Sequence, residues 1–190
     1  LLSRRQRQMC IRDRFNRTKR NLYLVISKIR GYISEFMQLY SNNVRVIDSM
    51  PIPVCEFGRA HFSKCFKGEA SYGICASKKE TYFGFKFHAL TTVDGFLTDY
   101  VITPANIDDR NAVWDLCDKY RSISIIGDKG YINKRLTPEL KSERDIDLLF
   151  LKRANSRDNY PKEVRQLLFK VRRRIETSFC LLYTSDAADD

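Results

Sequence analysis

Two aspartates and one glutamate have side chains that could perform chemistry together. Asp48 ends a short β-branched run, VRVID, and Asp128 ends a second apolar run, SISIIGD. Glu176 lies in the last predicted helix. Functional sites collect at strand ends in open α/β sheets, and a helix packed across such a sheet could bring Glu176 to the same place.

Three carboxylates that meet repel one another unless cations lie between them. Mg²⁺ prefers such hard oxygen ligands and completes its shell with phosphate oxygens. Two ions about 4 Å apart can activate a nucleophile and stabilise the leaving oxygen of a phosphodiester. We therefore predict that Asp48, Asp128 and Glu176 are catalytic metal ligands for two Mg²⁺ ions, for which Mn²⁺ can substitute.

Basic residues accompany these carboxylates. In the stretch VRRRIETSF, Arg172, Arg173 and Arg174 stand just before Glu176, and Lys129 follows the second aspartate. Such side chains could clamp a phosphate backbone, so these four are the predicted DNA-binding residues. Spacing alone leaves alternatives open: Glu176 as a solvated surface ion pair, and both aspartates as turn residues.

The composition fits a nucleic-acid partner. The 190 residues include 34 basic and 23 acidic ones, a formal net charge of +11, and 43% are hydrophobic, enough for a real core. No apolar run approaches the roughly 20 residues that cross a bilayer, and no leader is recognisable, so we expect a cytoplasmic protein. The six cysteines include no C-x-x-C pair, and we expect them to be reduced and mostly buried rather than zinc ligands.

Both ends of the chain have an unusual property. One short DNA string encodes residues 180–189, and its complementary strand, read one base out of register, encodes residues 4–13. The string resembles a sequencing-library adapter. We therefore predict that residues 1–14 and 180–190 are translated adapter, and that the gene product is longer at both ends.

The elements between these ends predict an α/β protein with a mixed sheet covered by helices. An amphipathic helix covers 22–40, a strand that PIP stops covers 44–48, and 55–80 reads as a long loop. Asp94-Gly95 marks a hairpin turn, and either Asp108 or Asp109 can cap the helix that follows the hairpin. The later elements expected are strands at 82–90, 96–103, 122–128 and 146–151 and helices from 108 or 109 to 120, at 134–143 and at 161–179.

Five motifs occur in an order that resembles the DDE transposases of bacterial insertion sequences, particularly the insertion sequence 982 group: VIDSMPIPVC, YFGFKFHAL, GFLTDYVITPANIDDR, GDKGY and RRRIETSF. The resemblance implies an RNase H-like fold, and the order of the elements predicts three antiparallel strands followed by two parallel strands. It gives Asp48, Asp128 and Glu176 the roles of the catalytic triad. Arg172 lies four residues before the glutamate, as an arginine does in related transposases, whereas Phe169 stands where those proteins have tyrosine.

The resemblance also implies the remaining assignments. His88 and Asp109 are similar to recurrent family positions and are predicted supporting residues, His88 on a strand near the site and Asp109 capping a helix. Residues 15–43 would be the remnant of an N-terminal DNA-binding region, and 44–179 the catalytic domain.

The predicted function is metal-dependent cleavage and strand transfer at the ends of an insertion sequence. The partners would be double-stranded transposon-end and target DNA in a bacterial nucleoid, with a homo-oligomer when the protein is full length. A nuclease of the same fold that does not join strands, or an inactive DNA-binding remnant, are the alternatives.

Overall fold

The chain divides into two compact units, Leu1–Ser41 and Asn42–Asp190. The computed structural model describes the chain except for five short stretches, and it also leaves out the side chains of a few further residues. The described residues are 4–75, 79–131, 135–150 and 160–187, without the side chains of 4–12, 129 and 182–187.

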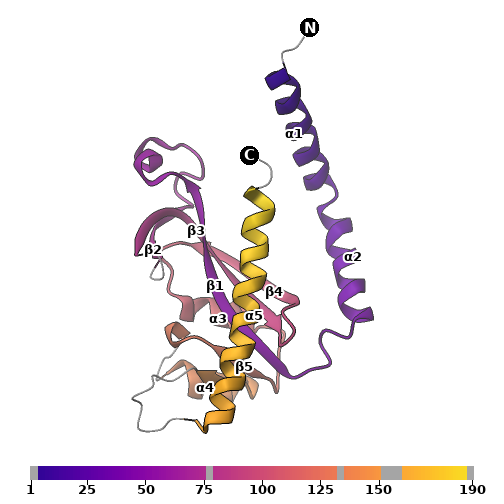
Figure 1. The fold of residues 1–190 in the computed structure, drawn as a ribbon, viewed down its shortest axis with the longest axis vertical. Helices are drawn as coiled ribbons and strands as arrows, with labels where there is room; N and C mark the ends of the chain where they lie inside the picture. Colours follow the sequence, from indigo (N-terminus) through magenta and orange to yellow (C-terminus); the bar gives the residue numbers. More distant parts are fainter. Residues whose placement is uncertain (1–3, 76–78, 132–134, 151–159, 188–190) are drawn as a thin grey trace. The chain divides into compact units, whose positions relative to one another are not determined.

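The first unit consists of two helices, α1 (Arg4–Asn21) and α2 (Tyr23–Phe36) (Figure 1). The predicted helix at 22–40 is therefore shorter at its C-terminal end, where Gln38 adopts a positive φ of 51°. Ser34 is the one buried residue of α2, while its apolar side chains are exposed, Phe36 by 89%. The helix α1 begins inside the segment predicted to be translated adapter, whose origin stays a prediction.

The second unit contains a six-stranded mixed sheet in the order β2-β3-β1-β5-β6, with β4 also paired to β3. β1 and β4 pair with β3 antiparallel, whereas β5 and β6 run parallel to β1, which confirms the predicted mixed α/β architecture. The strands are β1 (Val44–Cys55), β2 (Ser71–Cys75), β3 (Glu80–Thr92), β4 (Leu97–Pro104), β5 (Ser124–Gly127) and β6 (Asp147–Phe150).

The prediction that PIP ends the first strand is wrong. β1 continues through Pro51 and Pro53, which pair with Lys86 and Gly84 of β3. The pairing of β1 with β5 stops at Val46, and within the described part of the chain no other strand pairs with that edge of β1 beyond this point. Proline lacks an N–H group and is tolerated where that position faces an open edge.

The predicted loop at 55–80 is also partly wrong, because it contains the 3₁₀ helix η1 (Phe57–Phe62) and the strand β2. β2 pairs with residues 80–84 of β3. Gly73 obscures this strand in the sequence, yet a side chain there would not fit: a Cβ would lie 2.6 Å from the carbonyl oxygen of Ala105. The glycine therefore permits the close packing of β2.

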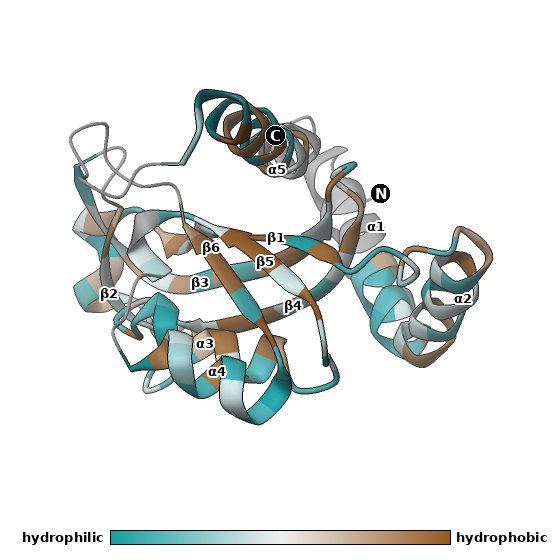
Figure 2. Ribbon diagram, turned by 90° about the horizontal axis from the view of Figure 1, so that it is seen from below, coloured by the Kyte–Doolittle hydropathy of each residue, from teal (hydrophilic) through white to brown (hydrophobic). Residues whose placement is uncertain are grey.

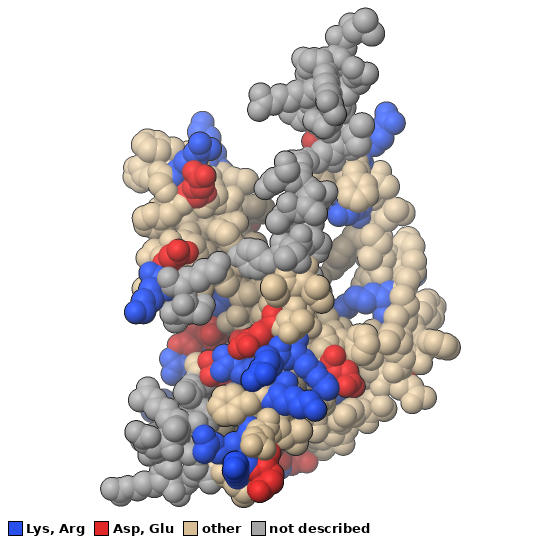
Figure 3. Space-filling view, viewed as in Figure 1, with Lys and Arg blue, Asp and Glu red and all other residues tan. Residues whose placement is uncertain are grey.

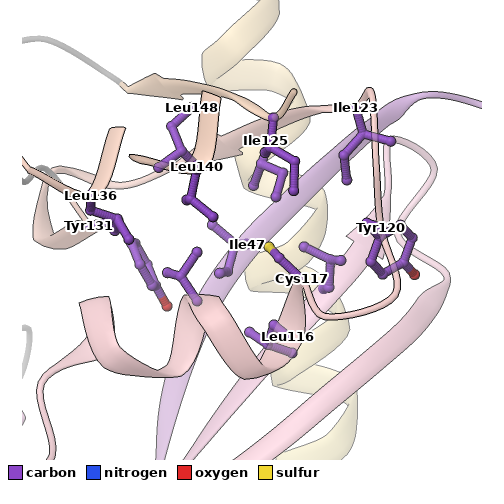
Figure 4. Close-up of a cluster of buried hydrophobic side chains, with 13 residues drawn as sticks. Ile47, Leu116, Cys117, Tyr120, Ile123, Ile125, Tyr131, Leu136, Leu140 and Leu148 are labelled. Carbon is purple, nitrogen blue, oxygen red and sulfur yellow. The ribbon is translucent and has the colours of Figure 1, made fainter. Parts of the chain in front are cut away.

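Helices cover both faces of the sheet (Figure 2). The helices α3 (Asp109–Leu116) and α4 (Leu136–Arg144) lie on one face, and α5 (Lys162–Ala187) lies on the other. The core on the first face joins Ile47 and Ile125 of the strands to Leu116 and Leu140 of the helices (Figure 4). Because side chains alternate along a strand, the neighbours of these strand residues face α5.

The α5 face has its own core. Val46, Ala89 and Ile126 of the sheet pack against buried residues of α5 that recur every three or four positions: Leu168, Val171, Ile175 and Phe179. This spacing places the four on one side of the helix and fixes its rotation about its axis. Complete burial of an aliphatic side chain stabilises a fold by roughly 1.5–3 kcal/mol, so the orientation of α5 is well determined.

Two expectations about the chain as a whole can be compared with the structure. The cysteines whose side chains are described are free, as expected, but only Cys117 among them is buried, so the prediction that most are buried is wrong. Among the described helices, none combines the length and the apolar character that a bilayer-spanning segment requires.

Candidate active site beside β1 and the end of β5

The two predicted catalytic aspartates lie at the same level of the sheet. Val46 of β1 pairs with Ile126 of β5, and this is the last pair that joins the two parallel strands. Asp48 and Asp128 each follow two residues later. Adjacent strands lie about 4.8 Å apart, and residues two apart share a face, so both aspartates continue the α5 side of the sheet.

The helix α5 brings the third carboxylate to this place. With Val171 and Ile175 buried against the sheet, the residues that follow each of them, Arg172 and Glu176, lie beside this contact on one side of the helix. Arg172 Nη1 donates a hydrogen bond of 3.0 Å to Asp128 Oδ1, and Arg172 Nε lies 3.3 Å from Glu176 Oε1. A single guanidinium thus links the second aspartate to the glutamate.

Asp128, Glu176 and Arg172 also influence the pKa of Asp48. The pKa of Asp48 is raised from 3.8 to about 6, chiefly by burial and to a smaller extent by the nearby charges of Asp128 and Glu176, while the Ser49 N–H and Arg172 oppose the shift. The Ser49 N–H donates to Asp48 Oδ1 at 2.9 Å. Because charges influence one another over short distances, the structure brings the three predicted carboxylates into one neighbourhood around Arg172.

The three carboxylates are of the ligand type that divalent cations prefer, but they are not close enough together to hold one ion. Three carboxylates offer the hard oxygen atoms that Mg²⁺ and Mn²⁺ prefer. Within the described ranges, however, no three Asp, Glu, His or Cys side chains are close enough to hold one ion together. The positive charge between Asp128 and Glu176 is that of Arg172, so the guanidinium stands where a cation would have to bind.

The three consecutive arginines have three different environments. Arg172 faces the carboxylates, whereas Arg174 Nη1 donates to the Val93 carbonyl at 2.9 Å and to Asp94 Oδ1 at 3.0 Å. Arg174 therefore fastens α5 to the turn between β3 and β4. Arg173 is exposed, and no side-chain partner is found for it within the described residues.

Basic side chains gather over the part of α5 that carries these arginines, with acidic side chains beside them (Figure 3). Lys129, the fourth predicted DNA-binding residue, lies in η2 (Lys129–Tyr131) directly after Asp128, and its side chain is outside the described residues.

Comparison with known proteins identifies the family. Residues 39–185 match the Transposase DDE domain family, which is more than half of the chain. The chain belongs to this family. The matched range contains both aspartates, Glu176 and the complete sheet.

A solved structure of a piggyBac transposase synaptic complex with hairpin DNA is also similar to this DDE domain chain, at 12% sequence identity and a TM-score of 0.40. The similarity covers 65% of this chain and 26% of that one, so the chain spans about a quarter of the length of this neighbour. None of the curated proteins matches the chain.

The two predicted supporting residues of the DDE domain lie on the α3 face of the sheet, opposite the triad. His88 pairs with Ser49 and is fully buried, with Nε2 3.0 Å from Thr103 Oγ1. Burial lowers the pKa of His88 to about 4, which Asp109 partly opposes. His88 is therefore a neutral core histidine behind the site.

The helix cap assigned to Asp109 is wrong, because the cap of α3 is Asp108, whose side chain accepts from the Arg110 N–H at 3.0 Å. Asp109 is the first residue of the helix and contacts Lys86 and Ser49 instead. The sequence pattern could have indicated the role of Lys86, because within the alternating strand YFGFKFHAL it lies on the same side as His88. A lysine at an inward position of a strand requires an acidic partner.

Proposed function

We propose that residues 44–179 form the catalytic domain of a DNA transposase that cleaves phosphodiester bonds at the ends of an insertion sequence and joins them to target DNA. The observation that carries this proposal is the convergence of Asp48, Asp128 and Glu176 from three separate elements, within a domain of the Transposase DDE family. The finer assignments, an RNase H-like fold and the insertion sequence 982 group, belong to the same proposal.

Asp48, Asp128 and Glu176 would hold the divalent cations, two Mg²⁺ or Mn²⁺ ions, which supply Lewis-acid activation of the nucleophile and stabilisation of the leaving oxygen. The chain's own contribution is to present three carboxylates from a strand, a strand end and a rigid helix. Arg172 pairs with Asp128 and Glu176 and offsets part of their negative charge. With cations bound to these carboxylates, the Arg172 guanidinium would be available to pair with a DNA phosphate.

The DNA partner follows from charge. Arg173 is exposed on the same helix as Glu176, three residues before it, and the chain carries a net charge of +11. Phosphate contacts of this kind supply affinity without sequence preference. We assign residues 15–43 to a remnant of the DNA-binding region and expect the full-length protein to act as a homo-oligomer on nucleoid DNA.

One observation favours a second candidate, an inactive DNA-binding domain. Arg172 is paired with both Asp128 and Glu176, and this arrangement would persist if the domain had lost its affinity for metal. Metal binding therefore separates the two candidates.

The test uses the 190-residue chain with Mg²⁺, a labelled duplex that carries the terminal sequence of the element, and a plasmid target. Transfer of label to the plasmid supports the transposase, whereas cleavage without joining identifies a nuclease. DNA binding that is unaffected by Mg²⁺, without either reaction, identifies the inactive domain. Asp128→Asn should abolish the chemistry and leave DNA binding equal or tighter, because less negative charge then faces the phosphates.

A further inference from the structure

Behind the triad, on the α3 face of the sheet, lies a group of polar side chains that the proposed chemistry does not use. Lys86 Nζ donates to Asp109 Oδ1 at 2.7 Å and to the Ile107 carbonyl at 2.9 Å. The Ser49 hydroxyl donates to Asp109 Oδ2 at 3.3 Å. Both oxygens of Asp109 are thus held, and its side chain is only 25% exposed, while that of Lys86 is 18% exposed.

Asp109 contacts the segments that carry both catalytic aspartates. Ser49 directly follows Asp48, and its N–H donates to the Asp48 carboxylate. Gly130 lies two residues after Asp128, and Asp109 Oδ2 is 3.7 Å from the position that a Cβ on this glycine would occupy. One carboxylate therefore lies against β1 next to Asp48 and against the turn that follows β5.

These two segments are not hydrogen-bonded to each other in the sheet, although β1 stays paired with β3 at Asp48 and Ser49. The hydrogen-bonded pairing of β1 with β5 ends at Val46 and Ile126, before either aspartate. Asp48 itself accepts the Ser49 N–H, so its orientation depends on the local backbone at Ser49. A contact that fixes Ser49 from the other face of the sheet would therefore also fix the orientation of the Asp48 carboxylate.

We propose that Asp109, fixed by Lys86, is a positioning residue that holds β1 at Ser49 and the turn after β5 in place relative to each other, so that Asp48 and Asp128 can bind metal together. The inference rests on the proposed function, because it assigns these aspartates to a metal site. Lys86 also neutralises Asp109, so the supporting carboxylate does not add an uncompensated negative charge behind the triad.

The test measures Mn²⁺ binding to the full 190-residue chain by electron paramagnetic resonance, together with the thermal unfolding midpoint. Outer residues that orient metal ligands typically change affinity about 10–100-fold, so we expect a decrease of this size for Asp109→Asn. Asp108→Asn is the matched control: it changes the neighbouring carboxylate, which caps α3 and pairs with Arg110. This control should bind Mn²⁺ with the affinity of the unmodified chain.

Two further substitutions guard against a variant that fails to fold. Ser49→Ala removes the hydroxyl that contacts Asp109 and should also weaken Mn²⁺ binding. The double variant Ser49→Ala/Asp109→Asn should bind Mn²⁺ no more weakly than Asp109→Asn alone. Non-additivity of this kind is expected of groups that act through one contact. Lys86→Arg should retain more Mn²⁺ affinity than Lys86→Met, because it preserves the ion pair.

The outcomes separate the inference from the function on which it rests. If Asp48→Asn loses Mn²⁺ while Asp109→Asn and Ser49→Ala keep full affinity, the positioning role is wrong and the metal site stands. A loss of thermal stability in Asp109→Asn without a change in affinity also overturns the inference, since Asp109 would then be only structural. If Asp48→Asn binds Mn²⁺ as well as the unmodified chain does, the metal site itself is wrong.

Discussion

Asp48 and Asp128 occupy equivalent positions on neighbouring parallel strands, each two residues beyond the last pair that joins β1 to β5. The strands are no longer hydrogen-bonded to each other at this level: Asp128 lies just beyond the end of β5, whereas Asp48 lies within β1, which stays paired with β3 there. The open ends of parallel strands are common places for ligand sites in α/β proteins. In this domain, α5 closes the site by adding Arg172 and Glu176.

The first prediction concerns the stability cost of Asp48. Its pKa is raised from 3.8 to about 6, so the folded protein binds this proton more tightly than the unfolded chain. Stability therefore falls as pH rises from about 4 to 6, by roughly 2–3 kcal/mol in total. Asp48→Asn should match the unmodified chain near pH 4 and exceed its free energy of unfolding by this amount at pH 7, as measured by urea denaturation.

Asp115→Asn is the control for the loss of one negative charge, because Asp115 is an exposed aspartate of α3. It should change the free energy of unfolding by no more than about 0.5 kcal/mol at either pH. Equal effects of the two substitutions at pH 7 would show that Asp48 is not buried as described.

The second prediction concerns His88, whose pKa shift makes the protein more stable as pH rises, the opposite of the effect of Asp48. Burial lowers its pKa from 6.5 to about 4, so the unfolded chain binds the proton more readily than the folded protein. Its contribution to stability is complete above about pH 6.5 and is lost as pH falls toward 4, by up to about 3 kcal/mol. His88→Gln should remove this acid sensitivity, so that the free energy of unfolding changes less between pH 7 and 4.5.

The matched substitution is His61→Gln, which changes an exposed histidine in η1. It should leave the pH dependence of unfolding as it is in the unmodified chain. A His88→Gln variant with the same pH dependence would mean that His88 is accessible to protons in the folded state.

The third prediction separates Arg173 from Arg174. Arg173→Ala should weaken binding to a random DNA duplex and reduce the slope of log affinity against log salt by about 1, with no change in stability. Arg174→Ala should instead lower the free energy of unfolding by about 0.5–1 kcal/mol, because it releases the turn at Val93 and Asp94. Equal salt slopes for Arg173→Ala and the unmodified chain would contradict the assignment of Arg173 to DNA.

The fourth prediction concerns Arg172 in the absence of metal. Arg172→Ala removes the cation that Asp128 and Glu176 share, so the metal-free domain should lose about 1–3 kcal/mol of stability at pH 7.5. Added Mn²⁺ should raise the unfolding midpoint of this variant more than that of the unmodified chain, because Arg172 no longer competes. An unchanged midpoint without metal would show that the two ion pairs contribute nothing.

The sequence predicted the elements of the site better than their contacts. The β-branched runs correctly place Asp48 in a strand and Asp128 at a strand end, although Asp48 lies within β1 and not at its end as predicted. Arg172 and Glu176 share a helix face because they are four residues apart. The pairing of Arg172 with Asp128 depends on the rotation of α5 over the sheet, which its buried residues set through contacts distant in sequence.

The errors have a similar origin. Asp108 and Asp109 are equally able to cap a helix, and only the position of Lys86 on β3 decides that Asp109 turns toward the sheet. Pro51 and Pro53 led to the prediction that the strand ends before them. The sequence does not reveal that β5 stops at Gly127 and so does not pair with the part of β1 that contains these prolines. Each error thus reflects a neighbour that local sequence patterns do not specify.

The last prediction tests this path of β1 beyond the site. A Cβ on Gly84 would lie 2.2 Å from the carbonyl oxygen of Ile52 and 2.9 Å from the nitrogen of Val54, both backbone atoms that cannot rotate away. Gly84→Ala should therefore force β1 away from β3 and lower the free energy of unfolding by about 2–3 kcal/mol. Gly58→Ala is the control, since no atom lies within 4 Å of its Cβ position, and it should leave the unfolding midpoint nearly unchanged. If Gly84→Ala is as stable as Gly58→Ala, β1 cannot run beside β3 through Pro53, and the strand would have to end close to Asp48, as its prolines alone suggest.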